Sequence, residues 1–361
     1  MGILNWLFGK KSTMYNYGKV EKALGAWQPY SGSSNIPGTR LPKNFMVPRA
    51  LRKSKEDPEQ TTLSSVLFPF WLRIDPSLAG FVVRKVNSGE MYKSKEIPRE
   101  GKEPRIISVP APVLKFIQRR ILLRLLEQID IHPAAHGFIK GRSIFTAAGP
   151  HVGRRVVVSM DIRDFFGTIS FKRVAGMFKK YGAAKKQALL LAGLCCYEKK
   201  LPQGAPTSPA ISNIVCKRLD SRISGLCRKH GFNYTRYADD LIFSGDDKLI
   251  RFIKIFREII AREGFTVAEE KTIIRRSGSR QQVLGLNVNS KVSVPRKARR
   301  LIRAMAHKQS QAGSPDGQMV DFLLGHASFM KTAHPEQAEA LKKELENTWK
   351  SHLAKKQPSR T

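Results

Sequence analysis

The chain has 361 residues, of which 41% are hydrophobic, enough for two or three subdomains with a sizeable core. Lys and Arg number 64 against 29 Asp and Glu, which leaves a net charge of +35 at pH 7. No window approaches the ~18 consecutive apolar residues of a membrane span, so a charge this large indicates a nucleic-acid partner, whose binding weakens steeply with salt.

The first 55 residues are rich in Gly, Ser, Pro and Lys and contain one short apolar cluster at residues 3–8. This cluster is too short for a signal peptide, so we expect an N-terminal extension or docking element. The four cysteines of the chain show no Cys-x-x-Cys spacing, and neither a zinc site nor a disulfide framework is expected. Reduced core thiols of this kind predict a cytoplasmic protein.

Two segments further along combine an extended run with a helix. Residues 102–110 read as a basic strand, and the helical stretch that follows carries further cations. Residues 201–209 contain three prolines and a Gln-Gly pair, which excludes a helix interior, and a helix-like run follows them. By itself, the second segment is as well explained by a plain structural loop.

Acidic residues fall at two strand-like places. Residues 155–161 read as a buried strand that ends in Asp161. Asp239 and Asp240 lie between two runs rich in aromatic and β-branched residues, 232–236 and 241–244, which predicts a hairpin. The nearby pair Asp246 and Asp247 precedes a helix-periodic stretch instead, so Asp246 is predicted to be a helix N-cap.

An Asp-Asp pair in a turn is commonly only a solvated loop or a helix cap, so a functional interpretation requires a chemical reason for these acids to lie close together. Two-metal phosphoryl transfer holds its ions roughly 3.5–4 Å apart with acids from separate segments. Clustered carboxylates without a cation repel each other by about 4 kcal/mol per pair at ~4 Å and an effective dielectric near 20. If Asp161, Asp239 and Asp240 converge, Mg²⁺ is therefore implied.

From about residue 291 onward the pattern is helical, with apolar residues in helix periodicity between Ala298 and Met305. Four cations near its start share one helix face, which suits a phosphate backbone as well as an ordinary solvated surface: Arg296, Arg299, Arg300 and Arg303.

Three motifs together carry a family resemblance. Asp161-Ile-Arg-Asp-Phe-Phe166, Leu201-Pro-Gln-Gly-Ala-Pro-Thr-Ser-Pro209 and Tyr237-Ala-Asp-Asp240 stand in the order and spacing of bacterial reverse transcriptases, and the match covers roughly residues 92–289. The resemblance implies an α+β right-hand polymerase fold with fingers, a palm whose antiparallel sheet packs on helices, and a helical thumb. It places the extension at 1–55, the fingers at 56–130, the palm at 131–290 and the thumb at 291–361.

The resemblance also implies roles for individual residues. Asp161, Asp239 and Asp240 would form the catalytic cluster that binds two Mg²⁺ ions, with Mn²⁺ as a possible substitute. The substrate-binding residues implied by the family are Arg105 and Lys102 on the triphosphate, Phe166 against the 2′-hydroxyl, Gln203 and Gly204 at the nucleotide pocket, and Lys271 near the pyrophosphate leaving group. For Phe166 and Lys271, a core aromatic and a solvent-facing lysine are the plain structural alternatives.

Compact chains of this family resemble retron enzymes, which copy part of a structured noncoding RNA into DNA in defence against phage, together with a separate effector protein. Cys195-Cys196-Tyr197 and Pro150-His151-Val152-Gly153 support that subgroup, whereas Ala147-Ala148 and Val283-Leu284-Gly285 depart from its usual residues. The expected partners are the noncoding RNA template, the RNA–DNA duplex and dNTPs, with no membrane. The alternatives are a defence-associated reverse transcriptase of another group and an RNA-binding protein with a silent palm.

Overall fold

The computed structural model describes residues 76–99, 102–312 and 314–356. The chain divides into two compact units that alternate along the sequence. The first unit contains the described residues up to His132 together with Asp164–Arg218, and the second contains Pro133–Arg163 together with the residues from Leu219 onward. The predicted boundaries near 130 and 290 stay a prediction, and the predicted extension at 1–55 lies outside the described residues.

The first unit is a long β-hairpin with helices. Strands β1 (Tyr92–Arg99) and β2 (Lys102–Pro110) pair antiparallel. The helices are α4 (Pro76–Asn87), α5 (Pro112–Arg124), the 3₁₀ turn η2 (Leu126–Gln128), α7 (Phe171–Lys180), α8 (Lys185–Cys195) and α9 (Ser208–Val215). Proline stands in the first turn of α5 and of α9, where a missing backbone N–H costs nothing. The basic strand predicted at 102–110 and the helix predicted to follow it are thus both present.

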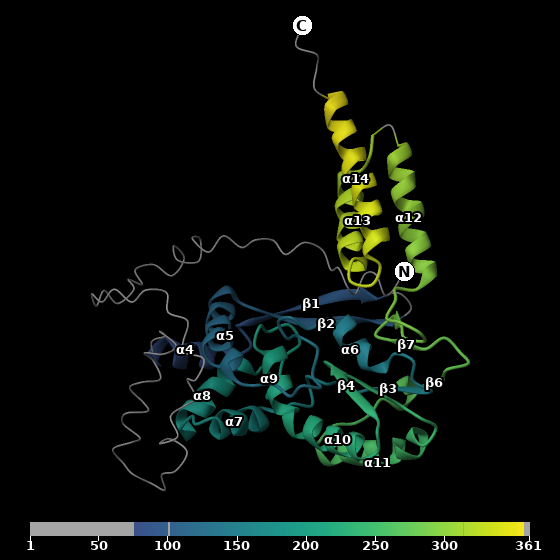
Figure 1. Ribbon diagram of the computed structural model, residues 1–361. Helices are drawn as coiled ribbons and strands as arrows, with labels where there is room; N and C mark the ends of the chain where they lie inside the picture. The colour runs from purple at the N-terminus through teal and green to yellow at the C-terminus, as the bar shows by residue number, and fades with distance from the viewer. Residues whose placement is uncertain (1–75, 100–101, 313, 357–361) are drawn as a thin grey trace, which may run out of the picture. The chain divides into compact units, whose positions relative to one another are not determined.

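The second unit contains a four-stranded antiparallel sheet of order β4-β5-β3-β6. Figure 1 labels three of its strands, β3, β4 and β6. Its strands are β3 (Val156–Asp161), β4 (Asn233–Tyr237), β5 (Asp240–Gly245) and β6 (Ile273–Arg276). Val156, Val157, Val158 and Met160 are all buried in β3, which agrees with the predicted buried strand. Successive side chains of a strand point to opposite faces, so the burial of consecutive valines means that both faces of β3 are covered.

Helices and short elements complete the second unit. They are α6 (Ile144–Ala148), η3 (Gly149–His151), α10 (Lys217–Lys229, from Leu219 onward), α11 (Leu249–Arg262), η4 (Glu269–Lys271) and the two-residue strands β7 (Gln282–Val283) and β8 (Leu286–Asn287). Helix α11 begins later than predicted: the Asp246 carboxylate accepts a hydrogen bond from the Lys248 backbone N–H at 3.1 Å, one turn ahead of the helix.

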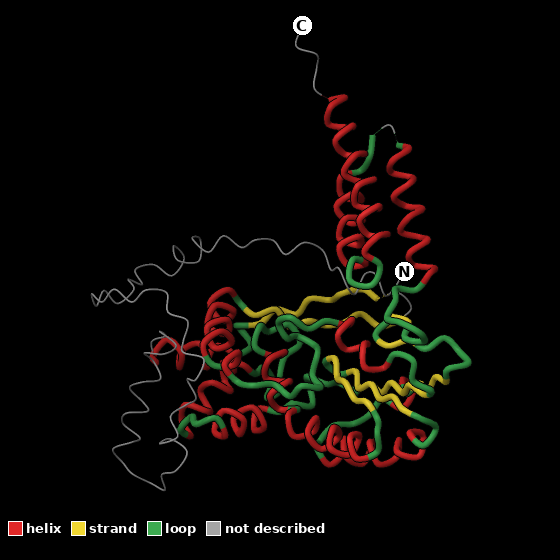
Figure 2. Tube along the Cα trace, viewed as in Figure 1, coloured by secondary structure: helices red, strands yellow, loops and turns green. Residues whose placement is uncertain are grey.

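The predicted helical segment after residue 291 forms three helices, α12 (Arg296–Gln311), α13 (Gly317–Met330) and α14 (Pro335–Lys356), drawn in red in Figure 2. Ile302, Leu323, Leu341 and Leu345 are buried among them. Leu301, part of the predicted apolar periodicity, is 46% exposed. The predicted combination of an antiparallel sheet with helices is confirmed.

All four cysteines are buried and free, as expected from their spacing. No helix in the described part of the chain has both the length and the apolar character that crossing a membrane requires.

Candidate active site

The β4–β5 hairpin turns sharply at Ala238 and Asp239. Tyr237 and Asp240 are the last paired residues of the two strands. Ala238 has a φ of 57°, a left-handed conformation that a residue with a side chain adopts only where its surroundings enforce it. The turn therefore presents two consecutive carboxylates from a tightly defined backbone, as the motif predicted.

The third predicted acid meets this turn through the sheet. Asp161 is the last residue of β3 and lies directly opposite Asp240 in the antiparallel register of β3 and β5. The backbone N–H of Ile162 donates to the Asp239 carbonyl at 3.0 Å. Opposed residues of an antiparallel pair have their side chains on the same face, with Cβ atoms about 4.5–5.5 Å apart. The structure thus brings Asp161 and the turn together across neighbouring strands.

The surroundings of Asp240 raise the proton affinity of its carboxylate. Burial, followed by the charges of Asp239 and Asp161, raises the pKa of Asp240 to about 7, although the nearby Lys271 ammonium acts in the opposite direction. A divalent cation would relieve both the repulsion and the desolvation, and carboxylate oxygens are the ligands that a hard cation such as Mg²⁺ prefers. The donor set therefore fits a metal of this type.

A lysine currently neutralises the first of these acids. The Lys271 ammonium donates to Asp161 Oδ1 at 2.7 Å, from a side chain that is 53% exposed. Among the described residues, no three His, Cys, Asp or Glu side chains converge as a metal-binding group. Metal binding by the three acids would require Asp161 to exchange the lysine for the ion. Lys271 was expected at the leaving group, so its contact with Asp161 is an addition to the predicted role.

Five predicted substrate-binding residues belong to the first unit. The Ser108 backbone N–H donates to the Gln203 carbonyl at 2.8 Å, which joins the 201–209 loop to strand β2, where Arg105 and Lys102 lie. Gly204 has a φ of 125°, and a Cβ there would lie 2.6 Å from the Ser108 carbonyl oxygen, so the close approach requires glycine. Phe166 is half-buried beside Phe165, with ring centroids 5.4 Å apart.

Comparison with known proteins settles the family. The model for "Reverse transcriptase (RNA-dependent DNA polymerase)" matches residues 97–288, more than half of the chain. This chain belongs to the reverse transcriptase family. The resemblance predicted from the three motifs and the predicted fold class are thereby confirmed, and enzymes of this family use divalent metal ions.

Curated relatives of this reverse transcriptase are named as retron enzymes. The retron Mx65 reverse transcriptase of Myxococcus xanthus is 39% identical over 69% of this chain and 63% of the relative. The retron Mx162 enzyme of the same organism is 36% identical, with 73% of this chain and 62% of the relative covered. The retron Ec86 enzyme of Escherichia coli is 34% identical, with 60% of this chain and 69% of the relative covered. The chain thus spans somewhat less than two thirds of the length of the two Myxococcus relatives.

Solved structures with a similar backbone include a telomerase of Candida albicans in complex with a TWJ fragment of telomeric RNA, with 11% identity, 73% of this chain and 60% of that chain covered, and a TM-score of 0.43. A foamy viral protease-reverse transcriptase in complex with double-stranded DNA is 14% identical, with 75% of this chain and 42% of that chain covered and a TM-score of 0.41.

The predicted nucleic-acid-binding arginines of the reverse transcriptase do not all face solvent. Arg296, Arg300 and Arg303 are exposed on α12. Arg299 is half-buried: it donates from Nη1 to Gln337 Oε1 at 2.6 Å and from Nε to the Val294 carbonyl at 3.1 Å. Arg299 therefore links α12 to α14, and the other three predicted arginines are exposed.

Sequence reasoning missed a buried ion pair next to the turn, between Asp220 on α10 and Arg236 on β4. The only available signal was an arginine in the middle of an otherwise strand-like run. An arginine on a half-solvated hairpin strand is ordinary, so the pattern alone did not distinguish it.

Proposed function

We propose that this chain is an RNA-directed DNA polymerase that copies a structured noncoding RNA into DNA. The observation that carries the proposal is the pairing of Asp161 with Asp240, which joins the strand acid to the acids of the hairpin turn. Family membership and the similarity to proteins named as retron reverse transcriptases support the reaction class.

Asp161, Asp239 and Asp240 would hold two Mg²⁺ ions, or Mn²⁺ in their place. When bound, the metal would activate the primer 3′-hydroxyl and neutralise charge on the transferred phosphate. In the absence of metal, Lys271 balances the charge of Asp161. Once Asp161 binds metal instead, the released Lys271 ammonium can donate a proton to the departing pyrophosphate.

In this proposal, residues of the first unit select the incoming nucleotide and neutralise the charge of its triphosphate. Arg105 and Lys102 bind the triphosphate, whose negative charge needs cations in a site with little water. Gln203 and Gly204 position the template base and the incoming nucleotide. Phe166 excludes a 2′-hydroxyl by volume, which favours dNTPs. We expect Phe166→Ala to incorporate ribonucleotides; equal discrimination in variant and wild type, measured by primer extension with each nucleotide, would contradict this role.

The exposed cations Arg296, Arg300 and Arg303 would contact the backbone of the RNA–DNA duplex. The proposed template is a noncoding RNA of the protein's own, and the proposed setting is anti-phage defence with a separate effector protein in the cytoplasm. Sequencing the RNA and DNA that copurify with the protein tests this part: an absence of covalently or stably associated DNA copied from one RNA would contradict the retron assignment.

The central test is Asp239→Asn, assayed by primer extension on an RNA template annealed to a DNA primer. DNA synthesis should be abolished, while fluorescence anisotropy shows binding of the same duplex within about twofold of wild type, because one neutralised carboxylate removes a metal ligand and no cation. The matched control is Asp246→Asn, seven residues away, where the amide oxygen of asparagine can still accept the hydrogen bond from the Lys248 backbone N–H.

Normal synthesis by Asp239→Asn would overturn the proposed catalytic role. Wild-type protein that binds the duplex tightly but synthesises nothing with Mg²⁺ or Mn²⁺ would favour the RNA-binding protein with a silent palm.

A further inference from the structure

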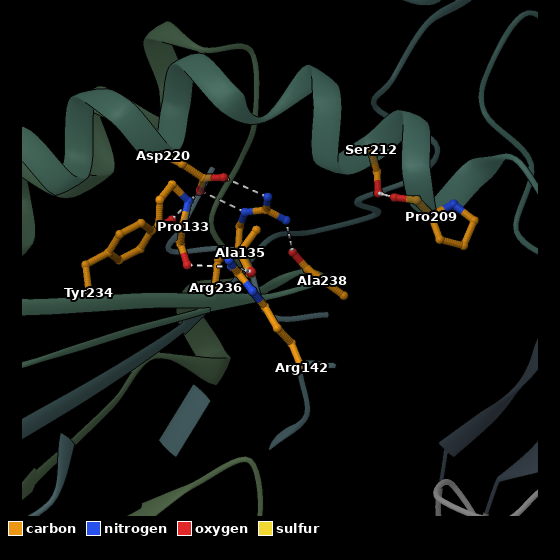
Figure 3. Close-up of polar contacts among 9 residues, drawn as sticks. All are labelled: Pro133, Ala135, Arg142, Pro209, Ser212, Asp220, Tyr234, Arg236 and Ala238. Carbon is orange, nitrogen blue, oxygen red and sulfur yellow. Dashed lines mark hydrogen bonds and ion pairs between the residues drawn. The ribbon is translucent and has the colours of Figure 1, made fainter. Parts of the chain in front are cut away.

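The hairpin turn is attached to helix α10 by a fully buried ion pair. Arg236 donates from Nε to Asp220 Oδ1 at 2.8 Å and from Nη2 to Asp220 Oδ2 at 2.7 Å. Both side chains are completely inaccessible to solvent. The Tyr234 hydroxyl donates to Asp220 Oδ1 at 2.8 Å, so the carboxylate has three donors (Figure 3).

The same guanidinium also reaches the turn itself. Arg236 Nη1 donates to the Ala238 carbonyl at 3.1 Å. This carbonyl belongs to the peptide bond between Ala238 and Asp239, directly after the residue with positive φ. In Figure 3 the guanidinium lies between Asp220 and Ala238. Arg236 therefore fixes the orientation of the peptide from which the Asp239 carboxylate projects.

A segment on the other side of β4 completes the support. The Arg236 backbone N–H donates to the Ala134 carbonyl, and the His136 backbone N–H donates to the Arg236 carbonyl, both at 2.7 Å. The Arg142 side chain binds the Pro133 carbonyl at 2.6 Å and also the Ala135 carbonyl, which folds this segment into a strap along the strand.

A fully buried ion pair is a poor way to gain stability, because desolvation of both charges offsets their attraction and an apolar pair often serves as well. An apolar pair could not hold the Ala238 carbonyl, however. The bidentate geometry of arginine fixes the guanidinium plane and leaves its third nitrogen directed at the turn. We therefore expect the ion pair between Asp220 and Arg236 to serve by fixing the position of the turn rather than by stabilising the fold.

We propose that Arg236, oriented by Asp220, is a positioning residue that holds the Tyr237-Ala238-Asp239-Asp240 turn in its left-handed conformation, so that Asp239 and Asp240 face Asp161. This inference rests on the proposed polymerase function. Arg236 touches no reacting group; it acts through the backbone of the turn.

The test is Arg236→Lys, which keeps the charge next to Asp220 but cannot bind both carboxylate oxygens and the Ala238 carbonyl together. At temperatures well below the unfolding midpoint of the variant, kcat for primer extension should fall by about tenfold or more, since misplacement by ~1 Å can cost 10²-fold. The KM for dNTP and the duplex Kd should stay within about twofold. Hydrogen–deuterium exchange of a peptide covering residues 237–241 should become faster.

The matched control is Ser244→Ala on the neighbouring strand. It removes the hydroxyl that contacts buried His151 Nδ1 at 2.7 Å, and so destabilises the same sheet without touching the turn. We expect a lower unfolding midpoint for this variant, with wild-type kcat and wild-type exchange at residues 237–241.

Wild-type kcat and wild-type exchange in Arg236→Lys would overturn the inference, as would equal losses in Ser244→Ala. If Arg236→Lys does not fold, Asp220→Asn provides the test, because asparagine keeps the side-chain shape and removes only the charge. Faster exchange at the turn together with a reduced kcat would support the positioning role of Arg236. Unchanged exchange and kcat would refute it. If the wild-type protein synthesises no DNA, the proposed function is overturned instead. The hydrogen–deuterium exchange comparison would then still test whether Arg236 holds the turn.

Discussion

Gly137 should be a sensitive position next to the proposed catalytic acids, because its backbone touches the hairpin turn. A Cβ built on Gly137 would lie 2.7 Å from the backbone nitrogen of Ala238 and 3.3 Å from the carbonyl carbon of Tyr237. Ordinary van der Waals contact begins at 3.4 Å, so Gly137→Ala requires the turn or the strap to move by 3.4 − 2.7, about 0.7 Å.

A displacement of this size should be visible in the reaction rate. Misplacement of a catalytic group by ~1 Å can cost 10²-fold, so we expect kcat for primer extension on an RNA template to fall about 10- to 10²-fold, equivalent to roughly 1.4–2.7 kcal/mol in the activation barrier. Duplex binding should be unchanged, because the substitution alters no charge.

Gly149→Ala provides the control for the same chemical change. A Cβ at Gly149 has no atom within 4 Å, and the residue has a helical φ of −49°, so alanine should be neutral or slightly stabilising there. Equal kcat values for Gly137→Ala, Gly149→Ala and wild type would refute the claim that the position of the turn governs the rate.

Two further predictions concern the charged and titratable groups of the second unit. Lys271→Met removes the ammonium that competes for Asp161; because an exposed ion pair contributes about 0.5–1 kcal/mol, Mn²⁺ should bind roughly two- to fivefold more tightly by calorimetry, and weaker or equal binding would argue against competition. His151 is buried between Ser244 and Thr235, and burial lowers its pKa from 6.5 to about 3. As pH falls from 6.5 towards 3, His151 is therefore protonated in the unfolded chain but stays neutral in the folded chain, and the folded state loses stability across that range. Between pH 7 and pH 4 the free energy of unfolding should fall by about 3 kcal/mol more in wild type than in His151→Gln, which does not titrate; parallel pH profiles from denaturant unfolding would contradict this.

Local patterns predicted the elements that carry the proposed site. The strand ending in Asp161, the hairpin around Asp239 and the helices after residue 291 follow from periodicity and from turn residues, which act over a few neighbours. The clustering of Asp161 with Asp239 and Asp240 was implied by the resemblance to bacterial reverse transcriptases, and the register of β3 and β5 agrees with it.

Long-range choices of partner were not predictable in the same way. Arg236 could have faced solvent from the hairpin, and nothing in the sequence pattern paired it with Asp220, 16 residues earlier. Lys271 pairs with Asp161, 110 residues away. The alternation of the two units along the chain likewise depends on tertiary contacts that periodicity does not specify.

The antiparallel pairing of β3 with β5 limits which length changes this protein can tolerate. Successive side chains of a strand alternate between its two faces, so one residue inserted between Val156 and Asp161 would rotate the aspartate to the opposite side and bury a neighbour's polar group. Natural variation in chain length should therefore avoid these two strands and accumulate in the exposed connection at residues 277–280, where an extra residue changes no partner of the acids.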